Sequence, residues 1–182
     1  MRVFCISGVP GSGKEEVAET MRRILWGYGC SVLILHLRDL PEFICKQVFH
    51  WDGKPGTRGQ RLYAHTVDSM REYDPEYFRS YITTLLRVYG DHFDYVFITD
   101  MDSVSDVAPL YAEGFHIRRI LVERPGYFSQ QPDDETPAAS MLSDNASLPD
   151  YVIHNDDGGA KLTQSCLEIL DPYLEIDRLK EW

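Results

Sequence analysis

The sequence predicts an α/β fold in which a five-stranded parallel sheet is covered by helices on both faces. Short apolar runs alternate with longer stretches of helical periodicity, which is the βαβ rhythm of such a sheet. The chain has 182 residues, about the length of one domain, and neither an internal repeat nor a long linker divides it. We therefore expect one three-layer domain over residues 1–182.

Five apolar runs are the expected strands. Each is rich in Val, Ile, Leu or Phe, which favour buried positions in a sheet. The runs cover residues 3–7, 31–36, 95–100, 117–122 and 151–154. The third ends in Asp100, an acid at the edge of a parallel sheet where ligands bind.

The stretches between the strands predict helices over about residues 14–26, 60–72 and 160–170. The apolar side of the first is formed by Val17, Met21, Ile24 and Leu25. A further helix begins near Pro41 and carries Phe43, Ile44 and Val48.

Another helix is expected to follow Asp74, with Asp74 as its N-cap and Pro75 at its first position. Its apolar side is formed by Phe78, Ile82, Leu85, Leu86 and Tyr89. Ser103 and Asp106 resemble a capping box for one more helix.

The composition excludes several classes of protein. With 29 acidic and 18 basic residues the net charge is −11, which argues against electrostatic binding of nucleic acid. No apolar run is long enough to span a bilayer, and the first strand begins so early that no room is left for a signal peptide. The four cysteines form no CxxC pair and no metal-binding spacing. We expect a cytoplasmic protein with reduced thiols.

Charge is spread unevenly along the chain. From Pro125 to the end there are 12 acidic and 3 basic residues, whereas 11 of the 18 basic residues lie between Arg38 and Arg124. Two interpretations stay open. The arginines bind a small, highly charged anion, or they form ordinary solvated helix faces.

A glycine-rich loop follows the first expected strand directly. Residues 8–14 read GVPGSGK and satisfy the GxxxxGK pattern, and a helix begins at once after them. In such loops backbone N–H groups surround phosphate oxygens and the lysine reaches the β- and γ-phosphates. The predicted ATP contacts are Gly8, Val9, Pro10, Gly11, Ser12, Gly13, Lys14, Glu15 and Glu16. An ordinary βα turn is the alternative.

Carboxylates stand where a P-loop commonly has a magnesium-binding hydroxyl. Lys14 is followed by Glu15 and Glu16 rather than by Ser or Thr. A carboxylate can hold Mg²⁺ directly or through water, so we expect Asp100 and Glu15 to hold the metal. The same charge lies close to the phosphates, which leaves open whether the metal site is intact.

Several segments resemble the P-loop nucleoside monophosphate kinases, most of all the phage-type deoxynucleoside monophosphate kinases. These segments occur in the family's order and span nearly the whole chain. They are Leu37–Asp39, Trp51–Lys54, Arg58–Leu62, Arg71–Pro75, Val122–Gly126 and Pro149–Asp156. Two departures stand out. Asp102 replaces an arginine of the family's DxR pattern, and no Lys or Arg lies between Pro125 and Ala160.

The resemblance implies an acceptor-binding region over about residues 38–90 and a lid-like segment over about 125–150. It implies that Lys14, Asp100 and Arg124 are catalytic and that Asn155 lies near the base of ATP. The acceptor phosphate would be bound by Arg38, Lys54, Arg61 and Arg71. Trp51, Tyr63 and Tyr73 either stack on the acceptor base or pack between helices.

The leading hypothesis is an ATP- and Mg²⁺-dependent kinase that converts a (deoxy)nucleoside monophosphate, a small-molecule substrate, to the diphosphate. The alternatives are a kinase of another small metabolite, such as a nucleoside or dephospho-CoA, and a nucleotide-binding protein that has lost catalysis. The sequence allows a homodimer but does not predict one.

Overall fold

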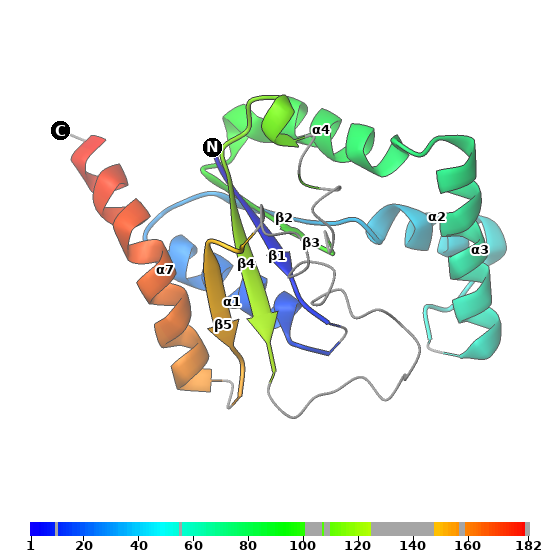
Figure 1. Ribbon diagram of the computed structural model, residues 1–182, viewed down its shortest axis with the longest axis horizontal. Helices are drawn as coiled ribbons and strands as arrows, with labels where there is room; N and C mark the ends of the chain where they lie inside the picture. The colour runs from blue at the N-terminus through cyan, green and yellow to red at the C-terminus, as the bar shows by residue number, and fades with distance from the viewer. Residues whose placement is uncertain are drawn as a thin grey trace.

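The computed structural model describes residues 1–9, 11–54, 56–100, 107, 110–124, 148–156 and 159–180. Its centre is a parallel sheet in the strand order β2-β3-β1-β4-β5 (Figure 1). The strands are β1 (Arg2–Ser7), β2 (Val32–His36), β3 (Tyr95–Thr99), β4 (Ile117–Glu123) and β5 (Tyr151–His154). All five predicted strands are confirmed, and the central position of β1 brings the end of this strand to the middle of the sheet.

The helices described are α1 (Lys14–Gly27), α2 (Asp39–Phe49), α3 (Thr57–Tyr73), α4 (Tyr77–Tyr89) and α7 (Gly159–Lys180), with a short 3₁₀ turn η1 (Gly90–His92). The predicted Ser103–Asp106 capping box lies outside the described residues. No helix in the described part of the chain has both the length and the apolar character that crossing a bilayer requires.

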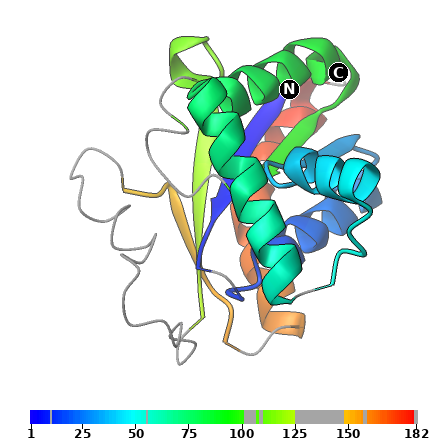
Figure 2. The same cartoon turned by 90° about the vertical axis from the view of Figure 1, so that its right-hand side faces the viewer.

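Two hydrophobic clusters fill the space on the two faces of the sheet. On one face, Phe4 and Phe97 pack with side chains of α1 and α7, among them Met21 and Cys166. On the other face, buried residues of α4 and the residues Val107 and Leu110 cover β1 and β3. Seen from the side, α1 and α7 lie together against the sheet (Figure 2). This is the predicted three-layer α/β sandwich.

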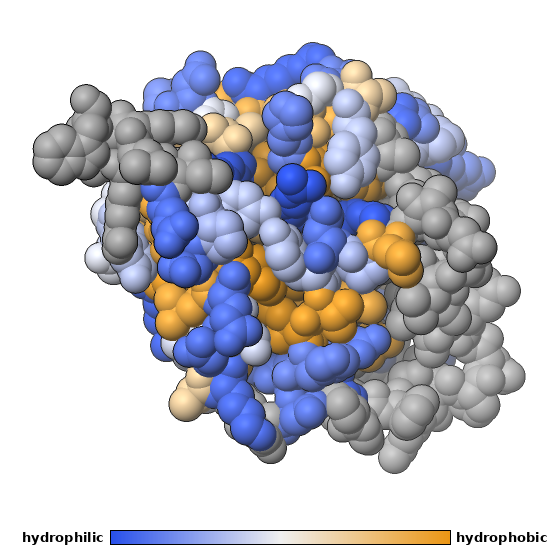
Figure 3. Space-filling model, turned by 60° about the vertical axis from the view of Figure 1, so that its left-hand side comes forward, coloured by the Kyte–Doolittle hydropathy of each residue, from blue (hydrophilic) through white to orange (hydrophobic). Residues whose placement is uncertain are grey.

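The surface on the side of α7 and β5 is mostly polar, with apolar residues visible between the polar ones (Figure 3). Leu148 and Val152 are among the apolar residues that stay exposed near β5.

Two apolar residues of α2 lie on its exposed side. Phe43 and Val48 are 60% and 63% exposed, whereas the buried residues of the helix are Pro41 and Cys45. The reason is that α2 extends away from the sheet with α3 (Figure 1), so only the narrow strip that faces α3 is covered.

The start of α4 and the end of α7 differ from the prediction for physical reasons that the structure shows. α4 begins at Tyr77, because Asp74 forms a turn in which its carboxylate accepts the N–H of Glu76 and its carbonyl accepts the N–H of Tyr77. α7 continues through Pro172, well past residue 170. Leu174 is buried in the core beyond this proline, and its packing outweighs the local preference to stop.

Candidate active site

The loop from Gly8 to Gly13 joins β1 to α1 at the carboxyl edge of the sheet. A Cβ on Gly8 would lie 2.5 Å from the carbonyl oxygen of Val122, and one on Gly13 would lie 2.1 Å from Asn155 Nδ2. Gly13 also has a φ of 94°, a left-handed conformation that a side chain strains. The close approach of the neighbouring segments therefore requires glycine at both ends of the loop.

Asn155 supports this loop from the last strand. Its Nδ2 donates a 3.0 Å hydrogen bond to the carbonyl of Ser12, and its backbone N–H donates a 2.7 Å bond to the carbonyl of Glu123. The side chain is almost fully buried. The structure thus brings Asn155, which the resemblance placed near the base of ATP, into contact with the backbone of the loop.

The Ser12 hydroxyl marks the interior of the loop. It is fully buried and, among the described residues, has no hydrogen-bond partner. A buried hydroxyl without a partner is costly, and a phosphate oxygen in the loop would give it an acceptor. Together with the glycine cradle, this hydroxyl fits the phosphates of ATP.

Lys14 and Asp100 form an ion pair at the centre of the site. Lys14 Nζ lies 3.0 Å from Asp100 Oδ1 and donates a hydrogen bond of 3.3 Å to the carbonyl of Gly8. Asp100 has a φ of 67°, which turns the chain sharply after β3. Thr99, which precedes it, hydrogen-bonds to His36 at the end of β2. The predicted lysine and aspartate are therefore brought together.

Arg38 extends this cluster to a third element. Its NH2 lies 3.1 Å from Glu15 Oε1, and its Nε lies 3.7 Å from Asp100 Oδ2 and 3.9 Å from Glu42 Oε1. Arg38 immediately precedes α2, Glu15 is in the first turn of α1, and Asp100 follows β3. Two cations and three carboxylates thus meet at one edge of the sheet.

The described residues contain no group of three His, Cys, Asp or Glu side chains placed to hold a metal ion. The oxygens of Asp100 and Glu15 are the donors that Mg²⁺ prefers, and this ion commonly takes its other ligands from phosphates and water. The predicted pair therefore fits Mg²⁺ only as part of a nucleotide complex.

Two of the other predicted cations have partners outside this cluster. Lys54 is 82% exposed and pairs with Asp52 at 3.5 Å, and the Arg71 guanidinium lies 5.8 Å from the centre of the Phe78 ring. Arg61 and Arg124 are exposed. Within the described part of the chain, Arg38 alone of the predicted acceptor residues joins Lys14.

Tyr63 lies on α3 and connects this cluster with the helical arm, the name used here for α2 and α3. Burial is the main cause that raises the pKa of its hydroxyl, and the nearby carboxylates of Asp100 and Glu42 raise this pKa further. Its ring centre lies 6.4 Å from that of Trp51. The sequence left two roles for Tyr63, stacking on an acceptor base or packing between helices. Nothing in its local sequence pattern indicated that it lies near Asp100.

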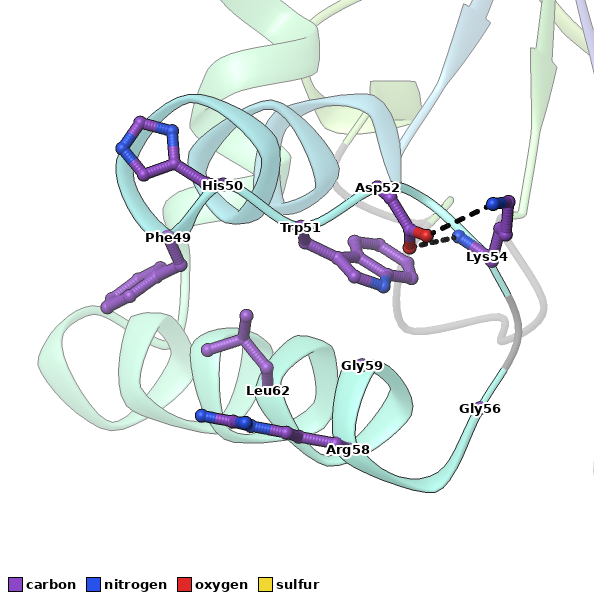
Figure 4. A pocket seen from close by; sticks show the side chains of 9 residues that line it. All are labelled: Phe49, His50, Trp51, Asp52, Lys54, Gly56, Arg58, Gly59 and Leu62. Carbon is purple, nitrogen blue, oxygen red and sulfur yellow. Dashed lines mark hydrogen bonds and ion pairs between the residues drawn. The ribbon is translucent and has the colours of Figure 1, made fainter.

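A cavity of about 890 Å³ lies next to Trp51, between the loop after α2 and the start of α3 (Figure 4). Phe49, Trp51 and Leu62 form its apolar wall, and Lys54 and Arg58 stand at its rim. The indole lies so close to α3 that a Cβ on Gly59 would meet Trp51 Nε1 at 2.2 Å. The cavity therefore combines an aromatic wall with basic side chains.

No protein-family model and no curated protein sequence matches this chain. Solved structures do resemble it. The APS kinase CysC of Mycobacterium tuberculosis, in complex with AMPPNP and APS, aligns with a TM-score of 0.51 at 14% identity and covers 93% of this chain and 95% of its own. A putative kinase from Chloroflexus aurantiacus aligns with a TM-score of 0.52 at 12% identity, covering 96% of each chain.

The thymidylate kinase of Ehrlichia chaffeensis is similar as well. It aligns with a TM-score of 0.50 at 13% identity and covers 94% of this chain and 97% of its own. At such low identity these likenesses show the fold alone. The chain has the three-layer α/β fold of P-loop kinases.

Proposed function

We propose that this protein is an ATP-dependent kinase that transfers a phosphoryl group to a (deoxy)nucleoside monophosphate, as the phage-type deoxynucleoside monophosphate kinases do. The observation that supports the proposal most directly is that Lys14 and Arg38 both form ion pairs with Asp100. One cation belongs to the phosphate loop and the other leads the α2–α3 arm, so a donor and an acceptor phosphate would approach each other there.

The protein's own residues supply positioning and positive charge. The loop backbone and Lys14 would hold the donor phosphates, and Arg38 would hold the acceptor phosphate by its planar guanidinium. Asp100 would hold Mg²⁺, which would supply neutralisation of the charge on the transferring group. No general base is required, because the acceptor phosphate oxygen is already ionised at neutral pH.

The remaining predicted residues belong to the same proposal. We assign Lys54, Arg61 and Arg71 to an acceptor region over about residues 38–90, and Arg124 to the start of a lid over about 125–150. The chain would act as one domain in the cytoplasm, either alone or as a homodimer.

A nucleotide-binding protein without turnover is the second candidate. It is favoured by the crowding of Glu15, Glu42 and Asp100 around Arg38, because these carboxylates compete with phosphates for the same guanidinium. A kinase of another small metabolite, such as a nucleoside or dephospho-CoA, would use the same loop with a different acceptor.

The test is phosphoryl transfer from Mg-ATP to a panel of ribo- and deoxynucleoside monophosphates. Lys14→Ala should lower the rate by orders of magnitude, since a contact with the transferring phosphates contributes roughly 3–4 kcal/mol. Lys161→Ala, at an exposed position on α7, is the matched control. AMPPNP binding without turnover on any acceptor would favour the second candidate.

A further inference from the structure

Three carboxylates surround the Arg38 guanidinium, and the nearest belongs to Glu15. The Glu15 contact is 3.1 Å, against 3.7 Å for Asp100 and 3.9 Å for Glu42. Glu15 and Arg38 are each about two-fifths exposed, so phosphates can reach both side chains. The residue that replaces the usual P-loop hydroxyl is thus paired with a protein cation.

The two partners belong to parts of the fold that are anchored differently. Glu15 follows Lys14 in the first turn of α1, and Val17 and Ala18 fix this helix in the core. Arg38 leads α2, which packs mainly on α3 away from the sheet (Figure 1). The pair therefore joins the first turn of α1 to the residue that precedes α2.

The pairing matters for nucleotide binding because Glu15 carries a negative charge close to the donor phosphates. An unpaired carboxylate one residue from Lys14 would repel the donor phosphates, whereas a carboxylate neutralised by Arg38 would repel them far less. Arg38 in turn is held in place by a residue in the first turn of α1, directly after the loop.

We propose that Glu15 is a positioning residue for Arg38, and that Arg38 in return neutralises Glu15 beside the donor phosphates. The inference rests on the proposed kinase function for its acceptor side, but its donor side is independent of turnover. It differs from the assignment of Glu15 as a magnesium ligand, in which the carboxylate acts on the metal and Arg38 acts separately.

The deciding experiment is a double-mutant cycle on the dissociation constant of Mg-AMPPNP, measured by calorimetry. Arg38→Gln should weaken binding by about threefold to fivefold, since it leaves Glu15 unpaired near the phosphates. Glu15→Gln alone should bind no more weakly than wild type. The double variant should return to within about twofold of wild type.

Glu19→Gln is the matched control. Glu19 lies one turn further along α1, pairs with Arg22 and has a similar side-chain exposure of 45%. It should leave AMPPNP binding unchanged. Additive effects in the cycle, or weaker binding by Glu15→Gln together with a higher Mg²⁺ requirement, would overturn the inference in favour of a metal ligand.

The acceptor side has its own readout. With an acceptor from the panel, Glu15→Gln should raise the KM for the acceptor by about threefold to tenfold and leave the KM for ATP unchanged. An unchanged acceptor KM would refute the positioning role. If no monophosphate is turned over, the kinase proposal fails, and the AMPPNP cycle still decides whether Arg38 neutralises Glu15.

Discussion

Asn155 and Ser12 are joined by a buried 3.0 Å hydrogen bond across 143 positions of the chain. The amide of Asn155 donates to the Ser12 carbonyl, and this bond ties the glycine-rich loop to the residue that follows β5. The loop is therefore shaped by tertiary contacts as well as by its glycines.

Replacing Asn155 by Ala should destabilise the protein and weaken nucleotide binding. The change leaves a buried carbonyl without its donor, which costs about 1–3 kcal/mol. Urea unfolding and the AMPPNP dissociation constant measure the two effects. Gln164→Ala, which removes a surface hydrogen bond to Glu168 on α7, should change neither.

Gly13→Ala should abolish tight AMPPNP binding. The new Cβ would lie 2.1 Å from Asn155 Nδ2, and the residue has a φ of 94°. Calorimetry of AMPPNP binding checks the prediction. At Gly27, the last residue of α1, a Cβ would meet nothing within 4 Å, so Gly27→Ala should bind like wild type. Equal affinity of both variants would contradict this account of the loop.

Gly59→Ala should displace Trp51 from α3. A Cβ at this position would lie 2.2 Å from the indole nitrogen, so the ring must move and the cavity beside it must change shape. The shift of the Trp51 indole N–H resonance measures this movement. Gly56→Ala introduces a Cβ with no neighbour within 4 Å and serves as the control. If the cavity binds the acceptor, only Gly59→Ala raises the acceptor KM.

Stability should fall as the pH rises above about 10. Burial and the hydrogen bond to Tyr173 raise the pKa of the Tyr151 hydroxyl to about 12 from its ordinary value of 10. The folded state thus holds this proton more tightly than the unfolded state, and the contribution is complete below about pH 10 and lost towards pH 12. Unfolding free energies across this range should fall more steeply for wild type than for Tyr151→Phe.

The sheet and the glycine-rich connection between β1 and α1 could be predicted because both depend on local signals. The buried strands are continuous apolar runs, and the loop has glycines at fixed spacing next to Lys14. The exposed side of α2 could not be predicted in this way. The position of α3 decides which apolar residues of α2 are covered. Phe43 and Val48 look like core residues in the sequence and are exposed in the fold.

The pairing of Glu15 with Arg38 could not be predicted from the sequence either. Glu15 and Arg38 lie 3.1 Å apart because the fold brings the first turn of α1 next to the residue that precedes α2. Motif spacing indicated a metal ligand, since it describes one segment at a time. Tyr63 is a similar case, because its proximity to Asp100 depends on how the helical arm folds back.

The hydrogen bond from Asn155 also has a consequence for biosynthesis. Ser12 is translated 143 positions before Asn155, so the loop is made long before the amide that supports it. A nascent chain that ends before residue 155 would have the complete GxxxxGK segment without this support. Capture by immobilised ATP would thus distinguish finished chains from unfinished ones. In a series of nascent chains of increasing length, affinity for ATP should appear abruptly once Asn155 can reach the Ser12 carbonyl.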